Sequence, residues 1–272
     1  MENALGKIEQ PISLPIVEIV EETATVKTFF FKKEFDSQPG QFVIMWIPRV
    51  DEKPFSVSYD DHGRLGLSIA NVGPFTKNLF NKKVGDLVGL RGPYGSWFKL
   101  KNNFKRILLV GGGYGVAPLA FLAQRAVKQK ITVDFCNGAR TKSLLLFKKR
   151  LTDYKVNLHI STDDGSDGIK GTVIDATNDC LGKNTYDAVY ICGPELMEKK
   201  IIDLCAEKNL ECRVSIERYM KCGFGICGQC CLDGSGERMC LEGPVVSGKY
   251  ALKHKEFGAY HRGKSGRKEY YK

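Results

Sequence analysis

Apolar residues in the first hundred positions of the chain come in short runs, and turn residues separate one run from the next. Runs of this length with regular turn signals predict an antiparallel β-barrel or sandwich. We expect turns at Pro39-Gly40 and Gly85-Asp86, and one helix at Phe75–Asn81. The expected strands are Ile16–Ile19, Val26–Phe31, Gln41–Ile47, Phe55–Ser58, Leu65–Ala70 and Leu87–Arg91. Residues 1–100 are therefore taken as one antiparallel β-barrel domain.

The pattern changes after residue 104, where apolar runs alternate with stretches of helical spacing. The expected strands are Arg106–Val110, Ile131–Phe135, Val156–Ser161, Ala188–Ile191 and Arg213–Ile216. The expected helices are Ala117–Lys128, Thr141–Leu151, Val173–Asn178 and Glu195–Lys208. Such alternation predicts a parallel sheet covered on both faces. Residues 101–217 are therefore expected to form an α/β domain, and residues 218–272 a small third domain.

Composition narrows the class of protein. The 272-residue chain is 43% hydrophobic, as in globular proteins, and no apolar run reaches the roughly 20 residues that span a bilayer. The N-terminal stretch lacks the features of a signal peptide, so we expect a cytoplasmic protein with reduced thiols and no membrane contact. Much of the net charge of +10 is in a basic C-terminal tail, which we interpret as solvated because no nucleic-acid-binding motif accompanies it.

A glycine-rich turn follows the first strand of the α/β region. The sequence RILLVGGGYGVAPLAFLAQRA predicts a strand, a turn and a helix, which would aim backbone N–H groups and a helix N-terminus at a phosphate. The candidate residues are Gly111, Gly112, Gly113 and Gly115. The motif differs from G-x-G-x-x-G because Val116 takes the place of the last glycine. A tight turn without a ligand remains the alternative.

A second turn, Cys192-Gly193-Pro194, follows the expected strand Ala188–Ile191. Ligands of open α/β sheets bind at the carboxyl ends of strands, so the two turns are expected to frame one nucleotide site. Cys192 is equally well explained as a small packed residue.

The order of barrel, VGGGYGVAPL and ICGPE resembles the ferredoxin–NADP reductase superfamily, whose members pass electrons between FAD and a nicotinamide nucleotide. The resemblance implies a flavin-binding barrel and a nucleotide-binding α/β domain. It assigns Lys53-Pro54-Phe55-Ser56 to FAD, with Lys53 at the pyrophosphate, Phe55 beside the flavin and Ser56 at its N5 edge. Lysine here replaces the family's usual arginine, which keeps the charge but loses the bidentate fork.

The same resemblance implies a second FAD element around a short helix. Gly73-Pro74-Phe75-Thr76 corresponds to the family's G-x-x-[ST] turn, so Gly73 and Thr76 are expected to contact FAD, together with Ile69 and Asn71 just before them. The stretch Arg91–Gly95 matches the end of the family's barrel and is interpreted as structural.

Four cysteines of the third region have a diagnostic spacing. Cys222, Cys227, Cys230 and Cys240 form C-x4-C-x2-C-x9-C, and C-x4-C-x2-C followed by a distant cysteine is typical of plant-type [2Fe–2S] sites. Zinc is the competing metal, although it usually takes paired C-x2-C arms. Cys231 is expected not to be a ligand, but it is adjacent to Cys230 and could replace it. The cysteines at 136, 180, 205 and 212 are interpreted as packing residues.

A cluster directly behind the nucleotide domain resembles the electron transfer subunits of NAD-dependent dihydroorotate dehydrogenases. That resemblance implies FAD, a [2Fe–2S] cluster and NAD as cofactors. It also implies an FMN-containing catalytic partner that oxidises dihydroorotate, two copies of each subunit, and docking through the cluster loop and basic tail. The alternatives are a homologous subunit of another complex (ferredoxin–NADP reductase, sulfhydrogenase or glutamate-synthase-like), a self-sufficient reductase, and a zinc-bearing interaction module. Arg140 and Lys142 leave the choice between NAD and NADP open.

Overall fold

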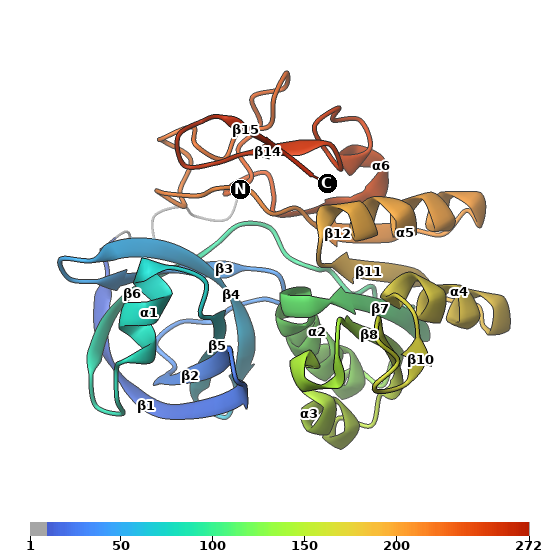
Figure 1. Ribbon diagram of the computed structural model, residues 1–272, viewed down its shortest axis with the longest axis horizontal. Coiled ribbons are helices and arrows are strands. Elements are labelled where there is room, and N and C mark those ends of the chain that lie inside the picture. Colours follow the sequence, from blue (N-terminus) through green and yellow to red (C-terminus); the bar gives the residue numbers. More distant parts are fainter. Residues whose placement is uncertain (1–9, 272) are drawn as a thin grey trace.

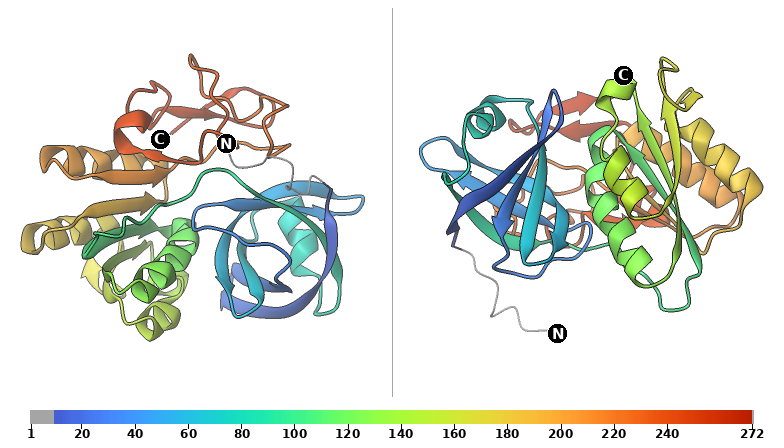
Figure 2. Two further views of the ribbon diagram at one scale, coloured as in Figure 1. Left: turned by 180° about the vertical axis from the view of Figure 1, so that it is seen from behind. Right: turned by 90° about the horizontal axis from the view of Figure 1, so that it is seen from below.

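The computed structural model describes residues 10–271 and consists of a β-barrel, a seven-stranded sheet with helices on both faces, and a third, largely irregular region (Figure 1). The third region lies across both the barrel and the sheet, as the view from behind also shows (Figure 2). The first nine residues, on which part of the signal-peptide prediction rests, lie outside the described residues. No helix within residues 10–271 is long and apolar enough to cross a membrane.

The barrel confirms the predicted antiparallel architecture. Its six strands are β1 (Ile12–Thr23), β2 (Val26–Lys32), β3 (Phe42–Ile47), β4 (Asp51–Asp61), β5 (Arg64–Ala70) and β6 (Leu87–Tyr94). They close in the order β1-β2-β5-β4-β3-β6, and every neighbouring pair is antiparallel. Apolar side chains such as Phe29, Phe31 and Leu67 fill the interior and are fully buried. Helix α1 (Pro74–Phe80) packs onto this core through Phe75 and Leu79.

The sheet confirms the predicted parallel arrangement, with one exception at its edge. Its order is β10-β9-β8-β7-β11-β12-β13, and only β13 runs antiparallel to its neighbour. The strands are β7 (Arg106–Gly112), β8 (Thr132–Ala139), β9 (Asn157–Thr162), β10 (Ile169–Lys170), β11 (Ala188–Cys192), β12 (Cys212–Ser215) and β13 (Val245–Ser247). The last strand follows the cysteine-rich stretch, so the third region contributes to the sheet.

Helices cover the sheet on both faces because alternate strand residues point to opposite sides. The helices are α2 (Val116–Lys128), α3 (Lys148–Asp153), α4 (Val173–Lys183) and α5 (Glu195–Glu207), with short 3-10 turns at η2 (Gly113–Gly115) and η3 (Lys142–Leu144). Ile107 and Leu109 pack with α2 and α3, whereas Leu108 and Val110 pack with α4 and α5. The two helix pairs lie on opposite sides of the strands (Figure 1).

One predicted helix is wrong in its extent. The stretch Thr141–Leu151 does not form a continuous helix, because Phe147 has a left-handed φ of 58° between η3 and α3. Leu145, Leu146 and Phe147 are buried there, so packing of these side chains takes precedence over helical spacing.

Helix α2 joins the barrel to the sheet. Its Phe121 is fully buried in the barrel core, whereas Leu119 and Leu122 of the same helix pack against the sheet. The amide of Gln124 also donates to Asp61 at the end of β4, at 2.9 Å. The helix behind the glycine turn therefore fixes the barrel relative to the nucleotide-binding half.

The third region has little regular structure before β13. Residues 217–244 contain one isolated bridge, Cys231↔Arg238, and the chain ends with α6 (Gly248–Ala251) and the hairpin of β14 (Tyr260–Arg262) and β15 (Lys268–Tyr270). The interpretation of the basic tail as merely solvated was wrong, because the tail folds back on the cysteine-rich stretch. Arg262 donates to both carboxylate oxygens of Asp233, at 2.8 and 2.9 Å.

Candidate functional site

The predicted flavin strand is the middle of β4. Lys53, Pro54, Phe55 and Ser56 are all half-buried, although the next two residues of the strand are fully buried. The Lys53 ammonium contacts the carboxylate of Asp51 and lies 6.0 Å from the ring centroid of Tyr219. Phe55 packs partly against the barrel core, whereas Lys53 lies beside the cysteine-rich region, so the strand presents partly exposed groups on which a cofactor fits.

The second predicted flavin element is the turn that begins α1. The Thr76 hydroxyl accepts N–H groups from Val72 and Gly73 at 3.0 Å and is itself buried, so it shapes the turn instead of pointing to solvent. Ile69 is buried in the barrel core, which leaves only its backbone for contact with a cofactor, whereas Asn71 is exposed. The rings of Phe55 and Phe75 lie 5.8 Å apart and connect the two flavin elements.

The two predicted nucleotide turns are packed against each other at the carboxyl edge of the sheet. Gly111 pairs with Cys192 in the register of β7 and β11. A Cβ atom at Gly115 would lie 2.1 Å from the carbonyl oxygen of Cys192, so no other residue fits without moving the backbone. A Cβ atom at Gly112 would lie 2.6 Å from the sulfur of Met197 on α5. Glycine is thus required at position 115 by backbone packing between the turns, and the turns pack closely although position 116 is valine.

The remaining residues of the turns have distinct environments. Gly113 has a φ of 55° and open space around it, at the start of η2. Desolvation raises the pKa of the Cys192 thiol well above its ordinary value, and the carboxylates of Glu198 and Glu217 act in the same direction. Cys192 is therefore a neutral thiol that packs partly into the sheet core. Pro194 directly precedes α5.

Glu198 was not predicted as a site residue, yet it holds the second turn. Its carboxylate accepts the Gly193 N–H at 3.0 Å, and the side chain is buried. Burial raises the pKa of Glu198 well above its ordinary value. Its position three residues after Glu195, in the first turn of the predicted helix, was the available signal in the sequence.

The four predicted cluster cysteines occur as two thiol pairs. Cys222 lies next to Cys227 and Cys230 lies next to Cys240, and the charge of Cys222 also acts on the Cys240 thiol. Cys227 is exposed at the surface, whereas Cys230 and Cys240 are buried. Glycines with left-handed φ values between 68° and 85°, at positions 223, 225 and 228, wrap the backbone around these sulfurs.

Backbone N–H groups favour the thiolate form of two of these cysteines. Burial opposes ionisation of Cys222, but N–H groups of Cys227, Ile226 and Phe224 directed at its sulfur lower the pKa to about 7. The neighbouring Cys240 thiol and further N–H groups lower the pKa of Cys230 to about 6 despite burial. Thiolates are the form that binds metal, so this loop is prepared for metal ligation.

The arrangement fits a two-iron cluster. Two neighbouring thiol pairs match a cluster in which four cysteines bind two irons, whereas zinc usually takes two C-x2-C arms and this chain has one, Cys227–Cys230. Cys231 is outside both pairs, and burial together with the charge of Cys230 raises the pKa of its thiol.

Two buried arginines that were not predicted hold the cluster loop in place. Arg91 on β6 donates to the carbonyl oxygen of Cys222 at 2.5 Å. Arg218, just before the loop, donates to Glu195 at 2.8 and 3.3 Å and to Glu256 at 2.8 Å. Glu256 also accepts the N–H of Asp233 at 2.7 Å. The first residue of α5, the cluster loop and the tail therefore share one buried ionic network.

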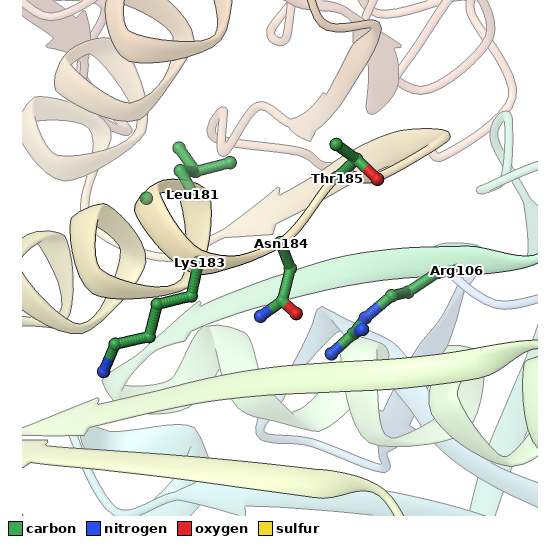
Figure 3. Close-up of a pocket in the computed structure, with 6 residues that line it drawn as sticks. Arg106, Leu181, Lys183, Asn184 and Thr185 are labelled. Carbon is green, nitrogen blue, oxygen red and sulfur yellow. The ribbon is translucent and has the colours of Figure 1, made fainter.

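An open pocket at another place in the molecule is not part of this site. It has a volume of about 400 Å³ and is lined by Arg106 and by residues 181–185 at the end of α4 (Figure 3). Arg106 begins β7, whereas the glycine turn follows the end of the same strand, so this pocket is at the opposite edge of the sheet from the candidate site.

Comparisons with known proteins agree with this geometry. The family profile described as the iron–sulfur cluster binding domain of dihydroorotate dehydrogenase B matches residues 217–250, and that of the oxidoreductase NAD-binding domain matches residues 109–203. Among solved structures, the NADH-dependent reduced ferredoxin–NADP oxidoreductase, studied for flavin-based electron bifurcation, has a TM-score of 0.78 and 29% identity. That alignment covers 89% of this chain and 92% of the other. The ferredoxin reductase of carbazole 1,9a-dioxygenase shares the fold at 21% identity, with a TM-score of 0.65 over 74% of this chain and 66% of that one.

Curated relatives span the whole chain. A protein of Methanocaldococcus jannaschii named "Probable dihydroorotate dehydrogenase B (NAD(+)), electron transfer subunit" is 45% identical over 97% of this chain and 100% of its own length. A protein of the same name from Methanothermobacter thermautotrophicus is also 45% identical, over 97% of this chain and 99% of its own. The chain therefore belongs to the family of electron transfer subunits of dihydroorotate dehydrogenase B.

Proposed function

We propose that this chain passes electrons, which a catalytic subunit takes from dihydroorotate, on to NAD⁺ in the pathway to pyrimidine nucleotides. The observation that carries the proposal is the presence of two thiol pairs beside the flavin strand, where Arg91 joins the carbonyl of Cys222 to Glu52 of β4. Full-length similarity to the electron transfer subunits named above supports the choice of dihydroorotate as electron source. The chain is thus an oxidoreductase subunit that works with a catalytic partner.

The residues divide the task among three sites. Lys53, Phe55 and Ser56 hold FAD along β4, with Gly73 and Thr76 shaping the turn at its second element. The turn Gly111–Gly115 and the turn Cys192–Pro194 bind the nicotinamide nucleotide. Cys222, Cys227, Cys230 and Cys240 bind the [2Fe–2S] cluster. When bound, the flavin supplies a centre that exchanges electrons singly or in pairs, and the protein supplies position and charge.

The partner is proposed to be an FMN-containing catalytic subunit, in a complex with two copies of each chain. The tip of the cluster loop supports docking there, because Ile226 is 76% exposed and Leu241 is 42% exposed beside the accessible Cys227. The basic hairpin β14–β15 lies beside this face, because Arg262 and Gly266 line the same hollow as Cys227 and Gly228. All ten cysteines are free of disulfides, which fits the reducing cytoplasm.

NAD is proposed as the nucleotide because the relatives are NAD-linked. Arg140 and Lys142 follow β8 at the same edge of the sheet and are exposed, so they are also positioned where a 2′-phosphate could be met. Steady-state comparison of NADH with NADPH tests this choice: a kcat/KM that is higher for NADH than for NADPH is expected, and a higher value for NADPH that falls in Arg140→Ala would contradict it.

The decisive experiment uses the native complex, purified anaerobically with its co-purifying subunits. Dihydroorotate and NAD⁺ are added and NADH is followed by absorbance. NADH formation is expected. If none forms although NADH still reduces the bound flavin and cluster, the electron path stands and dihydroorotate is not its source.

A second candidate function follows from the structural likeness to the ferredoxin–NADP oxidoreductase. In that case the same arrangement serves a different catalytic subunit. Reduced ferredoxin and NADP⁺, offered to the same complex in place of dihydroorotate, would then be consumed. A colourless purified protein would contradict both functions and favour a zinc-bearing module, because flavin and iron–sulfur centres absorb visible light.

A further inference from the structure

We propose that Arg91 is a positioning residue that anchors the first cluster ligand, Cys222, to the flavin strand β4 and sets the charge beside the metal centre. The inference rests on the proposed function, because it takes Cys222 as a cluster ligand and β4 as the flavin strand. It concerns how the two sites are held together within one chain.

The geometry around Arg91 is unusual for a barrel residue. The side chain is 5% exposed, and its guanidinium donates in three directions. It reaches the Glu52 carboxylate at 2.6 Å, the Tyr94 hydroxyl at 3.2 Å and the Cys222 carbonyl oxygen at 2.5 Å. Only arginine offers enough donors in a rigid fork to serve three acceptors at once.

Aromatic rings complete the enclosure of this cation. The guanidinium carbon lies 5.5 Å from the ring centroid of Phe224 and 5.6 Å from that of Tyr94. Phe224 belongs to the cluster loop and Tyr94 to β6, and their rings are 6.4 Å apart. The loop residue between the first two cysteines is therefore stacked onto the barrel through Arg91.

The acceptor Glu52 places this contact next to the flavin site. Glu52 immediately precedes Lys53 on β4, and the Lys53 ammonium lies near the ring of Tyr219, three residues before Cys222. The cluster loop thus touches the flavin strand at two points, one through Arg91 and one through Tyr219. A small shift of the loop at either point changes the separation of the two redox sites.

Charge gives Arg91 a second effect. Glu52 compensates the cation, so replacing Arg91 with an uncharged residue leaves a carboxylate beside the cluster loop without its partner. Extra negative charge disfavours adding an electron to a nearby metal centre, because charge and hydrogen bonding around the cysteines set cluster potentials. Loss of Arg91 should therefore lower the midpoint potential.

The test compares four variants of the cluster-loaded complex by redox titration and by rapid mixing with NADH. Arg91→Met should reduce the ratio of reduced to oxidised cluster at a fixed potential by about tenfold, which is about 59 mV for one electron. The rate at which NADH bleaches the cluster colour should fall by about tenfold as the loop shifts. Arg91→Lys keeps the charge but not the fork, so it should slow bleaching while leaving the potential near that of the parent.

Two further variants separate charge from position. Arg91→Met combined with Glu52→Gln removes both charges, so the potential should return toward the parent value while bleaching stays slow. Arg64→Ala is the matched control, because Arg64 is also a barrel arginine paired with a carboxylate, that of Glu18 at 2.5 Å, and its ring contacts, Phe30 and Tyr59, are in the barrel and not in the loop. It should change neither quantity by more than about twofold, as expected for an exposed charge.

The outcomes distinguish the inference from the function on which it rests. Wild-type potential and wild-type bleaching in Arg91→Lys and Arg91→Met would overturn the inference. If Arg91→Met does not fold, Arg91→Lys alone decides, since normal bleaching in that variant excludes a positioning role. Absence of any iron–sulfur signal in the parent protein would instead overturn the proposed function.

Discussion

The nucleotide turns and the cluster loop are both rich in glycine, but they are held in place in opposite ways. The nucleotide turns connect β7 to α2 and β11 to α5, and backbone packs directly on backbone, as Gly115 does on Cys192. The cluster loop has almost no regular structure, and buried side chains of Arg91 and Arg218 hold it from outside.

This difference predicts how the two sites depend on ligands. The nucleotide turns are fixed by the sheet and should keep their shape without nucleotide. The cluster loop gains order from ion pairs and metal, because a metal bound only by the folded state stabilises that state. This contrast between the two sites is tested by substitutions that remove the metal ligands, the packing of the nucleotide turns and the buried ion pairs one at a time.

Loss of a cluster ligand should have the largest effect. Cys240→Ser should abolish the iron–sulfur spectrum and dihydroorotate-driven NADH formation, whereas NADH oxidation with an artificial acceptor persists. Limited proteolysis should then cut between residues 222 and 240 and spare residues 111–115. Cys231→Ser is the control and should behave like the parent, because Cys231 lies outside the thiol pairs. Loss of the cluster in that control would revise the ligand set.

A larger side chain at Gly115, where the two nucleotide turns meet, should have the next largest effect. In Gly115→Val the new side chain meets the Cys192 carbonyl, so NADH oxidation should fall by about 100-fold as the turns separate. Overpacking of this kind costs about 1–3 kcal/mol of unfolding free energy. The iron–sulfur spectrum should remain, which is the reverse of the cysteine variant. Gly182→Ala, at a position with open space around it, should leave NADH oxidation unchanged.

Removing the buried cation at Arg218 should weaken the fold without touching a cofactor. Arg218→Met leaves Glu195 and Glu256 buried without their partner, which costs about 3–5 kcal/mol. Chemical denaturation of the apo-protein would show the loss. Arg238→Ala breaks an exposed pair with Glu242 and should cost less than about 1 kcal/mol. Equal losses in the two variants would contradict the central role of the Arg218 network.

The smallest effect on stability is expected from a change of pH, which acts on the pair of His159 and Asp134, far from both sites. The hydrogen bond to Asp134, followed by that to Cys180, raises the pKa of His159 to about 9 from an ordinary 6.5. A raised folded-state pKa adds stability that is fully present below pH 6.5 and is lost as pH rises through about 9. Since the His159 side chain is 31% exposed, the contribution should stay below about 1 kcal/mol. Urea titrations across this range should show it in the parent, and His159→Asn should remove it.

The sequence predicted those parts of the molecule that depend on local pattern. The barrel strands, the parallel sheet and the glycine turn follow from periodicity and turn residues near one another in the chain. The four cysteines of the cluster loop were identified from their spacing, but their grouping into two pairs was not predicted, and their roles as ligands stay a prediction.

Contacts between distant residues were missed because nothing local marks them. Arg91 meets Cys222 across 131 positions, and its stretch was interpreted as structural. Glu198 was missed because an acidic residue at the start of a helix is ordinarily explained by the helix dipole. The hairpin at the end of the chain was missed because its many charged residues suggested a solvated tail. The partner of both Arg262 and Lys268 is Asp233, which lies far away in the sequence, in the cluster loop.

The antiparallel strand β13 has a consequence for how such a protein could be assembled from parts. Ser215 and Val245 are paired neighbours, and the Ile216 N–H donates to the Pro244 carbonyl at 2.9 Å. The cysteine-bearing stretch between Ile216 and Pro244 therefore leaves and re-enters the sheet at one point, as an insertion between the two strands of a hairpin does. An insert with its ends already joined can lengthen, shorten or be exchanged without rerouting the host chain. A transplanted loop would still need its outside supports, Arg91 on β6 and Glu256 in the tail, to be supplied by the new host.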